Sequence, residues 1–184
     1  MSKATAVANP NIAFIKYWGK SDDALNLPAN PSVSMNLAAL TTVTTVEFQP
    51  GLRIDMVTID GDPAGGEALD RVVAHLDRVR SLAGTTAKAR VLSRSDFPVG
   101  TGLASSSSAF AALSLAASRA AGLDLDKQVL SRLARLGSGS ACRSVPSGFS
   151  LWEGERDENS FAQQVAGRGH WDLADVVAIV ARRH

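Results

Sequence analysis

A glycine-rich turn that leads into four serines is the segment of this sequence best suited to bind an anion. It runs from Pro98 to Phe110 as PVGTGLASSSSAF. Glycines allow backbone N–H groups to approach a phosphate closely, and a helix N-terminus adds a partial positive charge. The alternative is that the serines only cap a helix and the glycines only form a turn. We favour a phosphate site because the cluster is longer than a cap and a turn require.

A second cluster places two serines and one arginine after a predicted helix. In the segment GSGSACRS (137–144), Ser138 and Ser140 are two residues apart, so both hydroxyls could face one side of an extended turn. Arg143 supplies a planar fork of donors that suits a carboxylate or a phosphate. The ordinary alternative is a helix that stops at a glycine and is followed by an exposed arginine.

The third cluster contains two lysines. The segment NIAFIKYWGK (11–20) ends an apolar stretch with Lys16 and adds Lys20 four residues later. A lysine that is partly buried at the end of a strand needs an anionic partner, because desolvating its charge costs free energy. The alternative is a side chain that extends along the surface into water.

Three familiar catalytic motifs do not fit. The WGKS segment (18–21) resembles the end of a P-loop, but Phe14 occupies the position of the required upstream glycine. Residues 100–105 match only part of the G-x-G-x-x-G pattern of dinucleotide-binding proteins. They also do not follow the first strand of a βαβ unit, where that pattern is expected. A serine hydrolase is disfavoured, because the serine clusters lack a G-x-S-x-G turn and the histidines show no partnering pattern.

Predicted strands and helices must position these clusters. Runs of β-branched residues predict strands over residues 12–17, 43–48, 53–59 and 88–93. Apolar spacing or alanine-rich composition, with a glycine directly after each segment, predicts helices over 67–83, 105–121 and 126–136. Strands that come early and helices that cluster later favour an α+β fold.

The composition favours a small-molecule partner. The chain has 184 residues, 45% of them apolar, which is enough for one substantial core. Its 19 basic and 18 acidic residues nearly cancel, unlike those of proteins that coat nucleic acid or anionic membranes. No stretch approaches the roughly 20 apolar residues of a spanning helix, and Cys142 is the single cysteine, which fits a reducing compartment. We therefore expect a cytoplasmic protein without a nucleic-acid or membrane partner.

Together, the motifs resemble the mevalonate diphosphate decarboxylases, a family of the GHMP kinase superfamily. The matching segments are, in order, NIAFIKYWGK (11–20), LNLPANPSVS (25–34), FPVGTGLASS (97–106) and GSGSACRS (137–144). The resemblance covers nearly the whole chain. It implies an α+β, GHMP-kinase-type N-terminal domain with the ribosomal protein S5 domain 2-like fold, which we place at residues 1–170.

The resemblance also implies roles for individual residues. ATP, with Mg²⁺, would be bound by Ser93, Ser95, Gly100, Gly102, Leu103, Ala104, Ser105, Ser106 and Ser107. The diphosphate of mevalonate diphosphate would be bound by Tyr17, Lys20, Ser138 and Ser140. Arg143, supported by Asn11, would face the carboxylate that leaves as carbon dioxide, and Lys16 would lie beside the C3 hydroxyl. No residue is implied as a metal ligand.

The implied activity is the ATP-dependent decarboxylation of mevalonate 5-diphosphate to isopentenyl diphosphate in isoprenoid biosynthesis, by a homodimer. ATP phosphorylates the C3 hydroxyl, and loss of phosphate and carbon dioxide follows. The close alternatives are a phosphomevalonate decarboxylase and a mevalonate 3-kinase. Lys20 favours the diphosphate, because an extra cation helps to neutralise an extra phosphate.

The C-terminal segment allows an alternative interpretation, in which the chain is not an enzyme by itself. Residues 175–181 (DVVAIVA) predict a strand. This strand could lie at the edge of the same sheet. Alternatively, residues 171–184 could contain the first strand of a second domain whose remainder is essentially absent. The family's second domain supplies an aspartate that no position here matches, and we interpret Asp22 and Asp23 as solvated loop acids. We therefore expect this chain by itself to show no measurable decarboxylation. The remaining alternative is a non-catalytic fragment or interaction protein.

Overall fold

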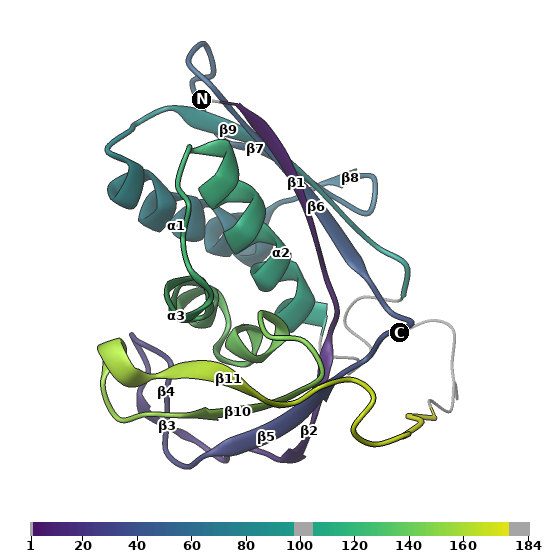
Figure 1. Cartoon of the computed structure of the whole chain (residues 1–184). Helices are drawn as coiled ribbons and strands as arrows, with labels where there is room; N and C mark the ends of the chain where they lie inside the picture. The colour runs from purple at the N-terminus through teal and green to yellow at the C-terminus, as the bar shows by residue number, and fades with distance from the viewer. Residues whose placement is uncertain (1, 98–104, 177–184) are drawn as a thin grey trace.

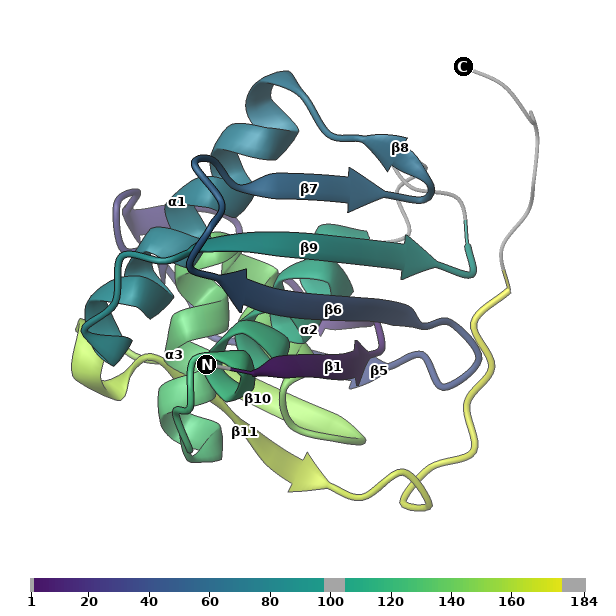
Figure 2. The same cartoon turned by 90° about the horizontal axis from the view of Figure 1, so that it is seen from above.

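The larger of two main sheets forms one side of the molecule in the computed structural model, which describes residues 2–97 and 105–176 (Figures 1 and 2). Its strand order is β1 (Lys3–Ala8), β6 (Thr42–Gln49), β9 (Lys88–Ser95), β7 (Met56–Ile59) and β8 (Asp62–Pro63). Neighbouring strands are antiparallel except β7 and β9, which are parallel. In β6 every second side chain is buried, because alternate residues of a strand face the helices.

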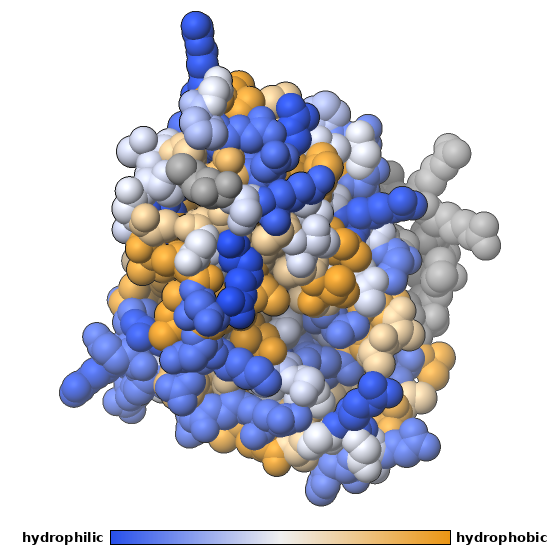
Figure 3. All heavy atoms as spheres, turned by 45° about the horizontal axis from the view of Figure 1, so that its top comes forward, coloured by the Kyte–Doolittle hydropathy of each residue, from blue (hydrophilic) through white to orange (hydrophobic). Residues whose placement is uncertain are grey.

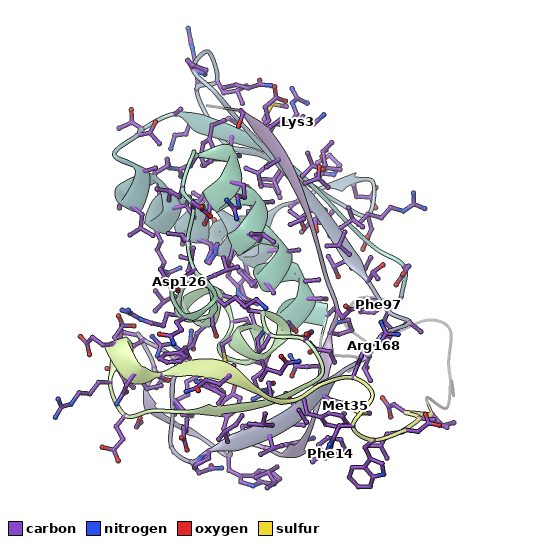
Figure 4. The ribbon with its side chains drawn as sticks, viewed as in Figure 1. Lys3, Phe14, Met35, Phe97, Asp126 and Arg168 are labelled. Carbon is purple, nitrogen blue, oxygen red and sulfur yellow. The ribbon has the colours of Figure 1, made fainter. Side chains whose placement is uncertain are left out.

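The second sheet carries Asn11 on β2 (Asn11–Ile15) and Ser32 on β5 (Ser32–Asn36). Its strand order is β11 (Phe161–Ala166), β10 (Phe149–Glu153), β5 and β2, all antiparallel. Asn11 pairs with Asn36, and Met35 pairs with both Ile12 and Phe149. Phe14 and Met35 lie on the side of this sheet that faces away from the helices (Figure 4). A small pair, β3 (Lys20–Asp22) and β4 (Leu27–Pro28), lies beside it.

The helices lie between the two sheets and form the core with the larger one (Figure 1). They are α1 (Gly66–Ala83), α2 (Ser105–Ala120) and α3 (Lys127–Gly137). Two short 3₁₀ helices follow in the chain: η1 (Gly139–Ser144) directly after α3, and η2 (Asp157–Asn159) between β10 and β11. Asp126 caps α3 by accepting a 2.9 Å hydrogen bond from the Val129 backbone N–H. Buried alanines of α2 let it pack closely on β1 and β6.

The fold confirms the α+β class and the three predicted helices, but several strand predictions need correction. The strand predicted at 12–17 ends at Ile15, and the strand predicted at 53–59 begins only at Met56, since a turn follows Pro50. Strands β10 and β11 follow the helices and were not predicted, because serine and glutamine interrupt their apolar pattern. The proposed extended turn after Ser138 is the 3₁₀ helix η1.

The predicted C-terminal strand lies outside the described residues apart from its first two, which are in no helix or strand. The domain boundary predicted between residues 170 and 171 remains a prediction. Within the described part of the chain, no helix combines the length and the apolarity needed to cross a bilayer. On the face in Figure 3, hydrophilic and apolar side chains are interspersed.

Candidate active site

Arg143 is a buried cation at the centre of the candidate site. Its side chain, on η1, is only 4% exposed. Its Nε donates to Asn11 Oδ1 at 3.2 Å and its Nη1 donates to Ser32 Oγ at 2.8 Å. No carboxylate lies within ion-pair distance of it in residues 2–97 and 105–176. Burial lowers the pKa of Arg143, but an arginine stays charged at neutral pH, so the site favours an anionic ligand.

Neutral partners hold this guanidinium in place. Asn11 is 3% exposed and uses its Nδ2 to donate to the Ser140 carbonyl at 3.1 Å and to Ser144 Oγ at 2.8 Å. Ser32 Oγ donates to the Ile15 carbonyl at 2.7 Å, so its lone pairs remain available to accept from Arg143. The sheet therefore orients Arg143 without neutralising its charge.

Two aromatic rings form a wall beside Arg143. The centroids of Tyr17 and Trp152 lie 5.6 Å and 5.5 Å from the guanidinium carbon, and the rings meet edge to face at 4.9 Å. A Cβ added to Gly139 would lie 3.0 Å from the Tyr17 hydroxyl oxygen and 3.5 Å from the Trp152 ring. The small residue at position 139 therefore allows η1 to pack against this wall.

Next to this wall lies a cationic pocket, which we call the anion pocket. Its volume is about 420 Å³. It is lined by Tyr17, Lys20, Asp23, Ala24, Asn26, Arg71, Ala74, Arg78, Leu136, Gly137, Ser138 and Gly139. Three of these residues are cations and one is an acid, which gives a formal charge of +2 among the described lining residues. The pocket is therefore suited to phosphate groups.

A second cavity, of about 240 Å³, lies between the larger sheet and helices α1 and α2. Ser93 and Ser95 line it from β9, where their hydroxyls pair with Thr44 and Thr42 at 2.9 Å. Its other lining residues are Thr44, Val57, Ile59, Ala68, Arg71, Val72, Val91, Ser105, Ser106, Ala109, Phe110 and Leu113. An apolar cavity with a few hydroxyls fits a nucleotide base and its sugar.

The two cavities meet at a hydrogen bond. Ser106 Oγ at the start of α2 lies 3.2 Å from Ser138 Oγ, and Arg71 lines both cavities. Ser107, by contrast, is fully buried, so its direct contact with a nucleotide stays a prediction. The proposed loop residues Gly100, Gly102, Leu103 and Ala104 lie outside the described residues.

The structure brings together only some of the predicted substrate residues. Tyr17, Lys20 and Ser138 line the anion pocket, and Arg143 contacts Tyr17. Ser140 is half-buried, and its backbone carbonyl accepts a hydrogen bond from Asn11 Nδ2. Ser140 does not line the anion pocket. The expectation that Lys16 is partly buried is wrong: this residue follows β2 and is exposed. Asp23 is 91% exposed, as expected of a loop acid, yet it lies 3.5 Å from Lys20 Nζ.

Four further residues of the site were not predicted from the sequence. Ser32 and Trp152 contact Arg143, and Arg71 and Arg78 line the anion pocket from α1. Arginines on an amphipathic helix normally indicate a solvated face, so their spacing carried no separate signal. No three His, Cys, Asp or Glu side chains gather as a metal site in the part of the chain that the structure describes.

Gly137 sets the distance between the anion pocket and the core. A Cβ at this position would overlap the Phe110 ring and lie 2.9 Å from His75 Nδ1. Gly137→Ala should therefore lower the free energy of unfolding by about 1–3 kcal/mol, as overpacking does, and should displace Ser138. Urea denaturation measures the loss. Gly167→Ala is the control, since nothing lies within 4 Å of its added Cβ; equal stability of the two variants would contradict the prediction.

The sequence is similar to that of one family of known proteins. The family model described as "Diphosphomevalonate decarboxylase-like N-terminal domain" matches residues 8–162. A phosphomevalonate decarboxylase of Haloferax volcanii is 39% identical over 180 residues, which are 97% of this chain and 54% of that protein. A diphosphomevalonate decarboxylase of Aspergillus fumigatus is 38% identical over 200 residues, with 97% and 49% covered.

Solved structures are similar over the same region. A mevalonate diphosphate decarboxylase from Enterococcus faecalis has a TM-score of 0.85 and 43% identity, over 90% of this chain and 52% of that one. The enzyme from Staphylococcus aureus has a TM-score of 0.86 and 43% identity, with 90% and 50% covered. The present chain spans about half the length of the relatives it matches.

Proposed function

The chain belongs to the family of diphosphomevalonate decarboxylase-like N-terminal domains, and we propose that it forms the ATP- and substrate-binding part of an enzyme that decarboxylates mevalonate 5-diphosphate to isopentenyl diphosphate. The observation that carries this proposal is Arg143, a buried cation without a carboxylate partner among the described residues, beside a cationic pocket. A ligand with a carboxylate at one end and phosphates at the other matches both features.

In the proposed complex, the carboxylate of the substrate binds Arg143. The phosphates of the substrate extend past Tyr17 toward Lys20 and Ser138. The Ser106–Ser138 hydrogen bond supports this orientation, since it links the substrate side to the nucleotide side. Catalysis of phosphoryl transfer depends mainly on positioning and on charge stabilisation. Buried Asn11 and Ser32 hold Arg143 at a fixed position, which supports a positioning role.

ATP is proposed as the second substrate, in the cavity lined by Ser93, Ser95 and Ser106. A mevalonate diphosphate decarboxylase structure described as "in complex with MVAPP, AMPPCP and Magnesium" has a TM-score of 0.85 to this chain. The described residues offer hydroxyls here and no cluster of carboxylates. We therefore propose that Mg²⁺ arrives with the ATP phosphates. The exposed side chain of Lys16 would reach the C3 hydroxyl only by turning into the site.

Arg143→Gln should weaken the binding of mevalonate 5-diphosphate by at least about 30-fold, the effect of removing one partner of a buried charge pair. The affinity of the purified chain is measured by isothermal titration calorimetry. Arg143→Lys, which keeps the charge without the fork, should restore part of the affinity, and exposed Arg168→Gln should leave it unchanged. Wild-type affinity in Arg143→Gln would refute the proposed carboxylate contact.

A second candidate is a phosphomevalonate decarboxylase. The 39% identical protein of Haloferax volcanii, which carries that name, favours it. The two functions differ in the number of phosphates that the anion pocket must hold. We also propose that the protein is a homodimer and that it is located in the cytoplasm.

A further inference from the structure

We propose that Arg78 is a specificity residue that makes the anion pocket favour a diphosphate over a monophosphate. The inference rests on the proposed function, because it concerns the phosphate end of the same substrate. Arg78 lies on α1, outside the segments 11–20, 25–34, 97–106 and 137–144 that carry the family resemblance.

One face of α1 forms a cationic wall of the pocket. Arg71, Ala74 and Arg78 all line it, and their spacing of three and four residues places them on one face of the helix. With a rise of about 1.5 Å per residue, the two arginines are about 10 Å apart along the helix axis. Ala74 between them has only a methyl group, so the space between the two guanidinium groups stays open.

The position of Arg78 follows from its neighbours on the helix. Arg71 Nη2 donates to the Gly137 carbonyl at 3.2 Å. His75 also adjoins Gly137, whose added Cβ would lie 2.9 Å from the imidazole Nδ1. Arg78 comes almost one turn after His75, so it lies beyond the Gly137–Ser138 end of the pocket. A phosphate bound at Ser138 would therefore need a second phosphate to reach Arg78.

Arg78 also differs from the other two cations of the pocket in its polar contacts with the described residues. Lys20 lies 3.5 Å from the Asp23 carboxylate. Arg71 bonds the Gly137 carbonyl and stacks over the Phe110 ring at 4.9 Å. Arg78 is half-buried and has no hydrogen bond or ion pair within residues 2–97 and 105–176. Its donors are therefore available to a ligand.

Charge explains why Arg78 should discriminate between the two ligands. A phosphate monoester carries a charge of about −1.5 to −2 at pH 7, and a diphosphate carries a further ionised phosphate. Coulomb energy scales with the product of the charges, so one more cation stabilises the diphosphate more. The guanidinium fork adds a bidentate contact to the outer phosphate only.

The test measures the dissociation constants of four ligands by calorimetry at low salt: mevalonate 5-diphosphate, mevalonate 5-phosphate, pyrophosphate and phosphate. Arg78→Gln should weaken mevalonate 5-diphosphate about tenfold and mevalonate 5-phosphate less than about threefold. Asp23→Asn, which raises the pocket charge by one, should tighten the diphosphate. Exposed Arg53→Gln, remote in sequence from the pocket residues, is the matched control. Thermal denaturation verifies that each variant is folded.

The outcomes separate this proposal from the proposed function. If both mevalonate esters bind and Arg78→Gln weakens them equally, the role of Arg78 is refuted and the proposed function stands. If only pyrophosphate binds, and with a dependence on Arg78, the role of Arg78 stands and the proposed substrate fails. If wild-type protein binds none of the four ligands, or if Asp23→Asn weakens the diphosphate, the role of Arg78 is refuted.

Discussion

Asp157→Asn should lower the free energy of unfolding by about 3 kcal/mol, the lower end of the range for breaking a buried ion pair. Asp157 on η2 accepts hydrogen bonds from two arginines of α3, Arg132 at 2.6 Å and Arg135. The Arg135 side chain is fully buried, whereas the Asp157 side chain is 31% exposed. Water therefore screens part of the interaction, which is why we expect the lower end.

The loss is large because Arg135 has no ion pair with any described residue other than Asp157. Its Nε and Nη1 have no hydrogen-bond partner among the described residues. Burial by itself would raise the pKa of Asp157, but the hydrogen bond from Arg132 and the charges of both arginines lower it. The carboxylate is therefore ionised at neutral pH, and its contribution is lost only as the pH falls below the ordinary range of an aspartate.

Urea denaturation at pH 7 measures the effect of Asp157→Asn. For a chain of this size, about 3 kcal/mol corresponds to a fall in Tm of about 6–12 °C. Asp124→Asn is the matched control, because the Arg119–Asp124 pair is exposed and such pairs contribute about 0–1 kcal/mol. Arg135→Met combined with Asp157→Asn should recover part of the loss, since it removes the unpaired charge. A loss no larger than that of the control would contradict this account.

Acidification should destabilise the protein through His75. This side chain is fully buried, and its Nε2 lies 2.8 Å from Ser114 Oγ. Ser114 Oγ donates to the Phe110 carbonyl at 2.6 Å, so the imidazole Nε2–H donates to Ser114 and the neutral ring is the form that fits. Burial, and to a lesser extent the charge of Arg78, lowers the pKa of His75 from 6.5 to about 3.

The sign of the pH effect follows from proton binding. Between pH 6.5 and 3 the unfolded chain takes up a proton at His75 and the folded chain does not. A falling pH therefore favours unfolding, by about 1.4 kcal/mol per pH unit in this range. The contribution is fully present above pH 6.5. From pH 6.5 to 4 the expected loss is about 3 kcal/mol.

Comparison of wild type with His75→Gln isolates this contribution, because carboxylates titrate in both proteins. The difference between their unfolding free energies should change by about 3 kcal/mol from pH 6.5 to 4 in urea denaturation series. His170→Gln replaces an exposed histidine that packs edge-on against Phe149 and should keep the wild-type slope. Parallel pH profiles for wild type and His75→Gln would refute the role of His75.

Local patterns in the sequence determined the helices and the family. Apolar spacing and terminal glycines predicted α1 and α3, and an unbroken alanine-rich run predicted α2, because helix formation depends on residues a few positions apart. The motifs around Lys20, Ser106 and Arg143 pointed to the family that the comparisons show. Residue types that bind anions are also visible without a structure, since guanidinium, ammonium and hydroxyl groups are chemical properties of single residues.

Only the tertiary structure decided which of these residues meet. Asn11 and Ser144 are 133 positions apart, and Ser32 and Arg143 are 111 apart. Their contact depends on how β2, β5 and η1 pack, which no local pattern encodes. For the same reason the sequence did not indicate that α1 turns Arg71 and Arg78 toward the anion pocket, or that Lys16 is exposed. A side chain's charge is fixed by its residue type, but its burial and its partners are fixed by the packing of distant elements.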